Sequence, residues 1–193
     1  MATDFSAWED EIRALAKQNR DAPCGAICFA GSSTMKLWFS LQRDFAEFPV
    51  VNCGFGGSQI FEATHFAPRI LIPLAPRQIV FYSGENDLAG GKSARQIADD
   101  WNKFQSVIRE ALPQTHVTLF SIKPSPARWE MIGEVRAAND FLRESTPDFV
   151  DTFHPMLNSD DLPRTELWTS DGIHMARAGY KLWAEILRPH LAL

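Results

Sequence analysis

The chain has 193 residues, of which 45% are hydrophobic and 22% are charged, and its formal net charge is −5. This length and composition are typical of one globular domain, so we expect a single domain over residues 1–193. The acidic balance and the lack of any basic run argue against nucleic acid as a partner. No stretch approaches the roughly 18 consecutive apolar residues of a membrane span, and the N-terminal region lacks the basic start and unbroken apolar stretch of a secretory signal. We therefore expect a cytoplasmic protein.

The hydrophobic pattern predicts an α/β fold. Apolar residues at three- and four-residue steps predict a helix over roughly residues 4–19. After it, short apolar runs alternate with longer amphipathic segments, which is typical of β-α units around a mainly parallel sheet. The predicted strands are Ala26–Ala30, Pro49–Asn52, Gln78–Tyr82, His116–Ser121 and Asp148–Thr152.

Helical spacing recurs between and after these strands. The apolar faces that predict helices are Trp38, Leu41 and Phe45; Ile97, Trp101, Phe104 and Ile108; Val135, Ala138 and Leu142; and Leu182, Trp183, Ile186 and Leu187. Ser93 and Gln96 are spaced as a capping box for the second of these helices. The longest segment without a clear period, residues 153–170, is expected to form a lid or a pocket wall.

In doubly wound sheets the ligand lies at the carboxyl ends of the strands, so the residues that follow each strand are candidates for chemistry. The first predicted strand is followed by Gly31-Ser32-Ser33-Thr34 and then by a helix. This layout can present a serine hydroxyl as a nucleophile on the first turn of the helix. The alternative is that Ser32 or Ser33 only caps the helix.

The next two strands are followed by groups that can donate hydrogen bonds. The glycines of Gly54-Phe55-Gly56-Gly57 allow a sharp turn whose N–H groups can face an anion, although a plain tight turn is the alternative. After the third strand, Gly84-Glu85-Asn86-Asp87 places an amide side chain at the same edge of the sheet.

The last informative stretch is Asp171-Gly172-Ile173-His174, just before the final predicted helix. At this spacing the Asp171 carboxylate can accept a hydrogen bond from one imidazole nitrogen and leave the other free to act as a base. For one isolated pair, a turn that happens to be followed by a histidine is the alternative.

Together these four segments resemble the four sequence blocks of the SGNH (GDSL-type) hydrolase family, in the family's order. The resemblance implies a three-layer α/β/α flavodoxin-like sandwich with a five-stranded parallel sheet in the order 2-1-3-4-5. It implies that Ser33 is the nucleophile and that Asp171 and His174 complete a catalytic triad. It further implies that Ser33, Gly57 and Asn86 supply the oxyanion hole. The small size and the Gly-Phe-Gly-Gly turn are similar to the platelet-activating-factor acetylhydrolase-like branch.

Several positions fall outside this pattern. Ser32 stands where the family commonly has Asp, and Cys53 stands where many members have Arg, which is expected to alter how the Gly54–Gly57 turn is braced. Cys53 and the two other cysteines, Cys24 and Cys28, are expected to be buried reduced thiols. Arg128, after the fourth predicted strand, is interpreted as a solvated surface residue, with contact to an anionic substrate as the alternative.

The expected function is hydrolysis of a small, short-acyl (acetyl-type) carboxylic ester through an acyl-enzyme. This chemistry needs no metal ion and no organic cofactor, and its partner is a small-molecule ester. Two alternatives stay open, namely an acyltransferase on the same fold and a non-catalytic ligand-binding module.

Overall fold

A five-stranded parallel sheet forms the centre of the protein in the computed structural model, which describes residues 4–191. The strand order is β2-β1-β3-β4-β5, as predicted from the family resemblance, and every neighbouring pair is parallel. The strands are β1 (Ile27–Gly31), β2 (Val50–Gly54), β3 (Gln78–Tyr82), β4 (His116–Phe120) and β5 (Phe149–Val150).

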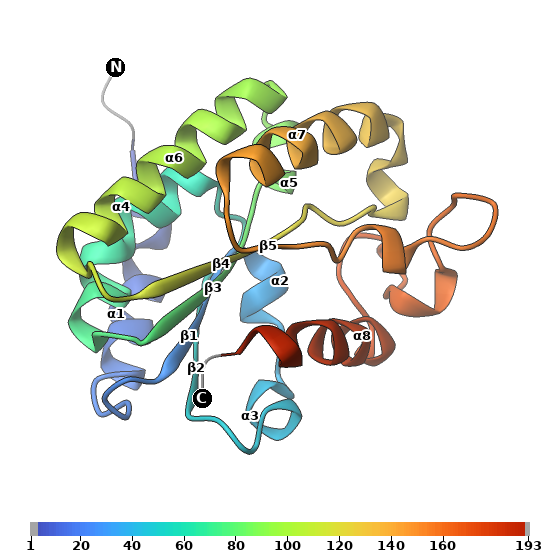
Figure 1. Cartoon of the computed structure of the whole chain (residues 1–193). Coiled ribbons are helices and arrows are strands. Elements are labelled where there is room, and N and C mark those ends of the chain that lie inside the picture. The colour runs from blue at the N-terminus through green and yellow to red at the C-terminus, as the bar shows by residue number, and fades with distance from the viewer. Residues whose placement is uncertain (1–3, 192–193) are drawn as a thin grey trace.

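Helices cover both faces of the sheet (Figure 1). One face carries α1 (Glu9–Gln18), α4 (Ile60–Ile70), α6 (Ala94–Ala111) and α7 (Ile132–Ser145). The other carries α2 (Ser33–Lys36), α3 (Leu41–Asp44) and α8 (Arg177–Leu187), and the short α5 (Glu85–Ala89) follows β3. Single 3₁₀ turns lie at Ser6–Trp8, Ile72–Leu74, Pro126–Met131, His154–Met156, Thr165–Leu167 and Arg188–His190.

The alternation of side chains along β1 explains the two layers of core. Cys28 and Ala30 face the apolar cluster under α1, α4, α6 and α7, whereas Ile27 and Phe29 face the cluster under α2, α3 and α8. All four are at most 2% exposed, because a parallel strand covered on both faces has no solvent side. The three-layer α/β/α prediction is therefore confirmed.

Most predicted helices are present, with one difference after β1. The face of Trp38, Leu41 and Phe45 does not belong to one helix, because α2 ends at Lys36 and α3 begins at Leu41. The Trp38 indole N–H donates to Asp44 Oδ2 over 2.8 Å, which fixes a turn between the two short helices. The predicted capping box is confirmed, since the Ser93 hydroxyl accepts from the Gln96 N–H at the start of α6.

The cysteines are free thiols, and two of the three are buried as predicted. Cys28 and Cys53 are buried, whereas Cys24 is exposed, so the prediction was wrong for Cys24. A side-chain contact with Cys28 and burial raise the pKa of the Cys53 thiol.

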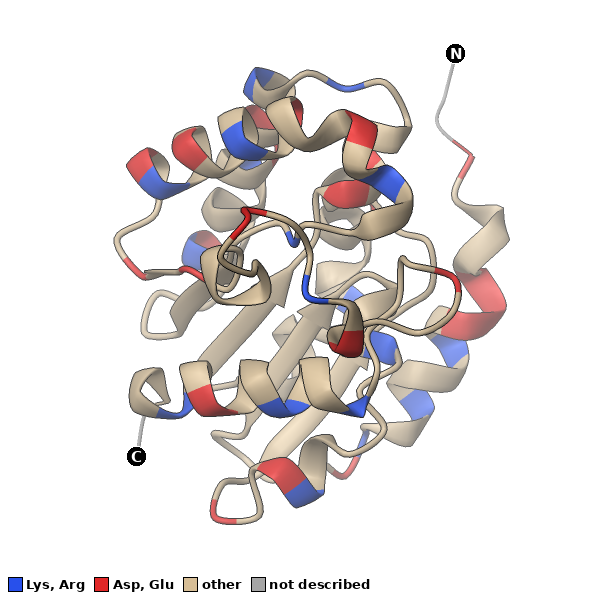
Figure 2. Ribbon diagram, turned by 90° about the vertical axis from the view of Figure 1, so that its right-hand side faces the viewer, with Lys and Arg blue, Asp and Glu red and all other residues tan. Residues whose placement is uncertain are grey.

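Charged side chains lie outside the sheet. Figure 2 shows acidic and basic residues interspersed along the helices and loops, and the five strands contain no Lys, Arg, Asp or Glu. Within residues 4–191, none of the helices combines the length and the apolar character needed to cross a bilayer.

Candidate active site

Ser33 is the first residue of α2, two positions beyond the end of β1. Its hydroxyl oxygen lies 3.1 Å from Nε2 of His174. The N-cap residue of this helix is Ser32, whose side chain makes no capping hydrogen bond, so the helix-cap alternative is wrong for Ser32. The N–H of Ser32 instead donates to the carbonyl of Tyr82 over 3.1 Å and ties the turn to the end of β3.

The turn that carries Ser33 depends on a glycine at the end of β1. Gly31 has φ +127°, and a Cβ at this position would lie 1.8 Å from the carbonyl oxygen of Tyr82. Residues with a side chain rarely adopt this backbone conformation, and here there is no space for one. Gly31 thus lets the Ser33 turn lie directly against the end of β3.

Asp171 and His174 form the second half of the site, in the loop before α8. Oδ2 of Asp171 lies 2.6 Å from Nδ1 of His174. Oδ1 of Asp171 accepts from the N–H groups of His174 (2.9 Å) and Ile173 (2.8 Å) and from the hydroxyl of Thr169 (2.7 Å). The backbone N–H of His174, followed by its imidazole, holds the pKa of Asp171 well below its usual range, so this carboxylate is ionised at neutral pH.

Two backbone N–H groups after β1 and β2 are available to an anion. Within the described part of the chain, neither the N–H of Ser33 nor that of Gly57 donates a hydrogen bond. Gly57, at φ +71°, lies in the turn after β2. Phe55 in the same turn donates its N–H to the carbonyl of Gly31 over 3.0 Å, so the turn is joined to the end of β1.

Asn86 lies on the short helix α5, which follows β3. Its Nδ2 donates to the carbonyl of Ser58 over 3.0 Å and retains a second N–H for another acceptor. The carboxylate of Asp87 accepts from the N–H of Ile60 at 3.2 Å, and this contact also joins the segments after β2 and β3. Burial raises the pKa of Asp87 and outweighs the opposing effect of Lys92.

Helix α1 and Trp8, just before it, brace the glycine turn. The sequence did not indicate these contacts. The Trp8 indole N–H donates to the carbonyl of Gly56 over 2.7 Å, and the N–H of Gly56 donates to the Glu11 carboxylate over 3.0 Å. Asn52 Oδ1 accepts from the N–H of Gly54 at 2.9 Å. These contacts brace the turn in this chain, which has Cys53 at the position where many family members have Arg.

A buried cluster of charged side chains lies behind Asn86. Glu85 pairs with the fully buried ammonium of Lys123, which also donates to the Ser125 hydroxyl over 2.8 Å. Nη1 of Arg128 lies 3.4 Å from Glu85 Oε1 and donates to Asn86 Oδ1 over 3.2 Å. Arg128 is thus bound to the site and only partly exposed, and its interpretation as a solvated surface residue was wrong.

The cluster shifts the pKa values of its members. Burial lowers the pKa of Lys123 and outweighs the effect of Glu85. For Glu85, burial acts to raise the pKa. The Lys123 ammonium, the Ser125 hydroxyl and the Arg128 guanidinium lower it and together outweigh burial, so the pKa falls below its usual value. The Glu85 carboxylate is therefore ionised at neutral pH.

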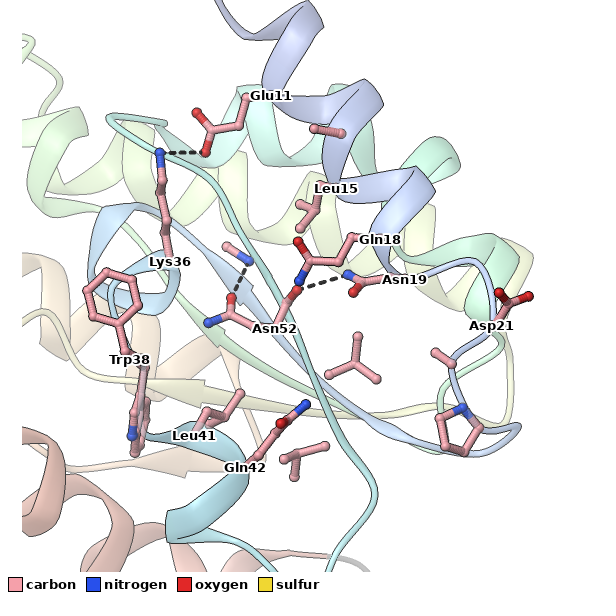
Figure 3. Close-up of a pocket in the computed structure, with 17 residues that line it drawn as sticks. Glu11, Leu15, Gln18, Asn19, Asp21, Lys36, Trp38, Leu41, Gln42 and Asn52 are labelled. Atoms are coloured by element: carbon pink, nitrogen blue, oxygen red, sulfur yellow. Dashed lines mark hydrogen bonds and ion pairs between the residues drawn. The ribbon is translucent and has the colours of Figure 1, made fainter.

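Two hollows flank Phe39. One, of about 650 Å³, lies between α1 and the edge strand β2 and is lined by both polar and apolar side chains (Figure 3). In it, Lys36 pairs with Glu11 at 3.0 Å, and the Asn19 amide donates to the Asn52 carbonyl over 2.9 Å. It contains none of Ser33, Asp171 and His174. The other, of about 530 Å³, is mainly apolar and includes His174 in its wall.

Residues 153–170 contribute to the wall of the apolar hollow, and a pocket wall was one of the two roles expected for them. Thr169 lines the apolar hollow, while Trp168 is buried with its ring 5.5 Å from the Lys123 ammonium.

Among residues 4–191, no cluster of three or more His, Cys, Asp or Glu side chains is arranged to hold a metal ion.

The four sequence blocks thus meet at the carboxyl ends of β1, β2 and β3. The GDSL-like Lipase/Acylhydrolase family model matches residues 28–182, a range that contains all four. The chain belongs to this family. As a GDSL-like lipase/acylhydrolase it is an ester hydrolase of the serine type, as the resemblance predicted.

Solved structures of low sequence identity share the fold. A candidate acylhydrolase from Bacteroides fragilis is 18% identical, with a TM-score of 0.81 over 98% of this chain and 97% of its own. A GDSL-like lipase from Bacteroides thetaiotaomicron is 18% identical, with a TM-score of 0.77 over 97% and 96%. A structure from Streptococcus pneumonia, described as a candidate platelet activating factor, is 22% identical, with a TM-score of 0.83 over 95% and 92%. No curated protein matches the chain.

Proposed function

We propose that this GDSL-like hydrolase cleaves a small, short-acyl carboxylic ester through an acyl-enzyme on Ser33. The observation that carries the proposal is the hydrogen-bonded chain from Ser33 Oγ to His174 Nε2 (3.1 Å) and from His174 Nδ1 to Asp171 Oδ2 (2.6 Å). In this order the ionised carboxylate fixes the imidazole tautomer, and Nε2 accepts the serine proton.

The reaction then proceeds in two halves. Ser33 Oγ attacks the ester carbonyl while His174 takes its proton, and the negative oxygen that forms is met by the unpaired N–H groups of Ser33 and Gly57 and by Asn86 Nδ2. Preorganised donors of this kind are usually the largest catalytic contribution. His174 then gives its proton to the departing alcohol, and a water molecule activated by the same imidazole releases the acid.

Hydrolysis is favoured over transfer to another alcohol by the exposure of the triad. The side chains of His174 and Asp171 are 30% and 45% exposed, so water reaches the acyl-enzyme without displacing a lid. A short acyl group is favoured because the segments that carry Gly57 and Asn86 are joined directly to each other through Ser58. We expect this connection to narrow the space for the acyl group.

The test is hydrolysis of p-nitrophenyl esters of increasing acyl length by the wild-type protein and by Ser33→Ala and Ser32→Ala variants. We expect the highest kcat/KM on the acetate and a loss of about 10⁶ in kcat for Ser33→Ala, by comparison with other triads. Ser32→Ala is the matched control and is expected to retain most of the activity, since among the described residues the hydroxyl that is hydrogen-bonded to His174 Nε2 is that of Ser33.

Covalent labelling provides an independent check. An organophosphonate should label Ser33 stoichiometrically, as shown by peptide mass mapping of the labelled protein. A label on Ser32, or equal hydrolysis by wild type and Ser33→Ala, would contradict the assignment of the nucleophile.

A further inference from the structure

An apolar groove begins at the imidazole of the triad. Its volume is about 530 Å³, and its apolar lining comes from two segments on either side of His174: Leu37 and Phe39 before α3, and Met175, Ala176 and Tyr180 at the start of α8. It differs from the hollow in Figure 3, which shares Phe39 with it but lacks His174.

The wall formed by α8 is fixed relative to the nucleophile. The Tyr180 hydroxyl donates to the carbonyl of Thr34, next to Ser33, over 2.9 Å. The Tyr180 ring also packs against the buried indole of Trp38, with ring centroids 5.2 Å apart. These contacts fix the α8 wall of the groove relative to the helix that carries Ser33 without a ligand, as is usual for preformed ligand sites.

The polar side chains around the groove are mostly engaged elsewhere. Arg177 donates to both oxygens of Asp44, at 2.9 and 2.5 Å, and the Ser40 hydroxyl donates to the same carboxylate over 2.7 Å. The Thr169 hydroxyl donates to Asp171 over 2.7 Å. Arg43 remains as an exposed cation at the rim. The surface that the groove offers to a ligand is thus chiefly apolar.

Phe39 is the most exposed apolar residue in this region. Its exposed fraction is 88%, and the other large exposed apolar residue between positions 4 and 191 is Leu162, at 47%. A single exposed apolar residue is ordinary on a protein surface. At Phe39, however, the ring borders a hollow that reaches the catalytic imidazole.

We propose that this groove binds the alcohol part of the ester, and that the substrates are short-acyl esters of alcohols with an apolar alkyl or aryl group. The inference rests on the proposed function. His174 takes the proton of Ser33 and gives it to the ester oxygen as the bond between that oxygen and the acyl carbon breaks, so the alcohol part must lie beside Nε2. The groove is the mainly apolar hollow whose wall includes this imidazole.

Two isomeric esters test the assignment. Hexyl acetate and ethyl hexanoate have the same atoms and nearly the same hydrophobicity, but the long chain lies on the alcohol side in the first and on the acyl side in the second. We expect the wild-type kcat/KM to be at least tenfold higher for hexyl acetate. Phe39→Ser should lower the ratio of the two kcat/KM values about tenfold, which is the effect of losing one aromatic contact of about 1.4 kcal/mol.

Leu162→Ser is the matched control, because it removes the other exposed apolar side chain and lies outside the groove. It should leave the ratio unchanged, and thermal unfolding should confirm that both variants are folded. A wild-type preference for ethyl hexanoate, or a ratio unaffected by Phe39→Ser, overturns the groove assignment while Ser33-dependent hydrolysis persists. Hydrolysis that survives Ser33→Ala overturns the proposed function itself, and the groove assignment with it.

Discussion

Arg128 donates from Nη1 to Oδ1 of Asn86 over 3.2 Å. The two ends of an asparagine amide are nearly identical in shape, and only their hydrogen-bond partners determine which way the group points. Arg128 can accept nothing, so it fixes the oxygen on its own side, and Ser58 O fixes the nitrogen on the other at 3.0 Å. The amide thereby presents its remaining N–H in one defined orientation.

Removing this contact should lower the rate of the chemical step. Asn86→Ala loses one oxyanion donor and is expected to reduce kcat by about 10²–10³. Arg128→Ala keeps the donor but releases its orientation, so we expect a smaller loss of kcat, about tenfold, with KM changed much less. Steady-state kinetics on an acetate ester measures both. Arg143→Ala, which removes an exposed arginine paired with Asp140, is the control and should change neither constant.

A double-mutant cycle separates orientation from general damage. If Arg128 acts through the amide, Arg128→Ala should have almost no further effect on kcat when Asn86 is already alanine. Full additivity of the two losses would show that Arg128 acts on the substrate or on the fold instead.

Replacing one partner of the buried Lys123–Glu85 pair should destabilise the fold strongly, whereas replacing both partners with apolar residues should destabilise it little. Lys123 is 1% exposed, so Lys123→Met leaves the Glu85 carboxylate buried without its main partner and should destabilise the protein by about 3–5 kcal/mol. The double variant with Glu85→Leu should recover most of that loss, because no uncompensated charge remains. Urea unfolding at neutral pH measures both, and a double variant as unstable as Lys123→Met would contradict the argument.

The lowered pKa of Glu85 also predicts a pH dependence of stability. Above the pKa of the unfolded side chain, roughly 4.3, the carboxylate is ionised in both states and its stabilisation by Lys123 is complete. As the pH falls further, the unfolded chain takes up the proton first, and the stabilisation is lost until the folded pKa is passed.

Glu85→Gln isolates this contribution from the other carboxylates. The difference in free energy of unfolding between wild type and Glu85→Gln should be largest between pH 5 and 7 and should shrink toward pH 3, as followed by urea unfolding across this range. A difference that grows in acid would mean that the folded pKa is raised.

The hydrophobic pattern predicts the sheet well because its strands are buried on both faces. Strands such as β3, Gln78–Tyr82, appear as nearly continuous apolar runs, and the predicted bounds are those observed. Prediction is weaker where tertiary contacts override periodicity. The Trp38 side chain has helical spacing to Leu41, but its bond to Asp44 selects a turn.

The contact between Asp171 and His174 could be predicted from the sequence, whereas the contacts that brace Asn86 and the glycine turn could not. Asp171 and His174 are close in sequence, and a local turn brings them together. Arg128 and Asn86 are separated by 42 positions, and Trp8 and Gly56 by 48, so their contacts exist only once the sheet has formed. A lone arginine after a strand or a tryptophan on an amphipathic helix carries no local signal of such a role.

Two glycines near the nucleophile should respond very differently to the same substitution. At Gly31 a Cβ would overlap the backbone of Tyr82, and φ is +127°, so Gly31→Ala should destabilise the fold by more than about 3 kcal/mol and displace the Ser33 turn. At Gly57, φ is +71° but nothing lies within 4 Å of an added Cβ. Gly57→Ala should therefore cost only the backbone strain of about 1–2 kcal/mol. Chemical unfolding of both variants measures the difference, and similar losses would show that steric overlap with β3 is not what requires glycine at position 31.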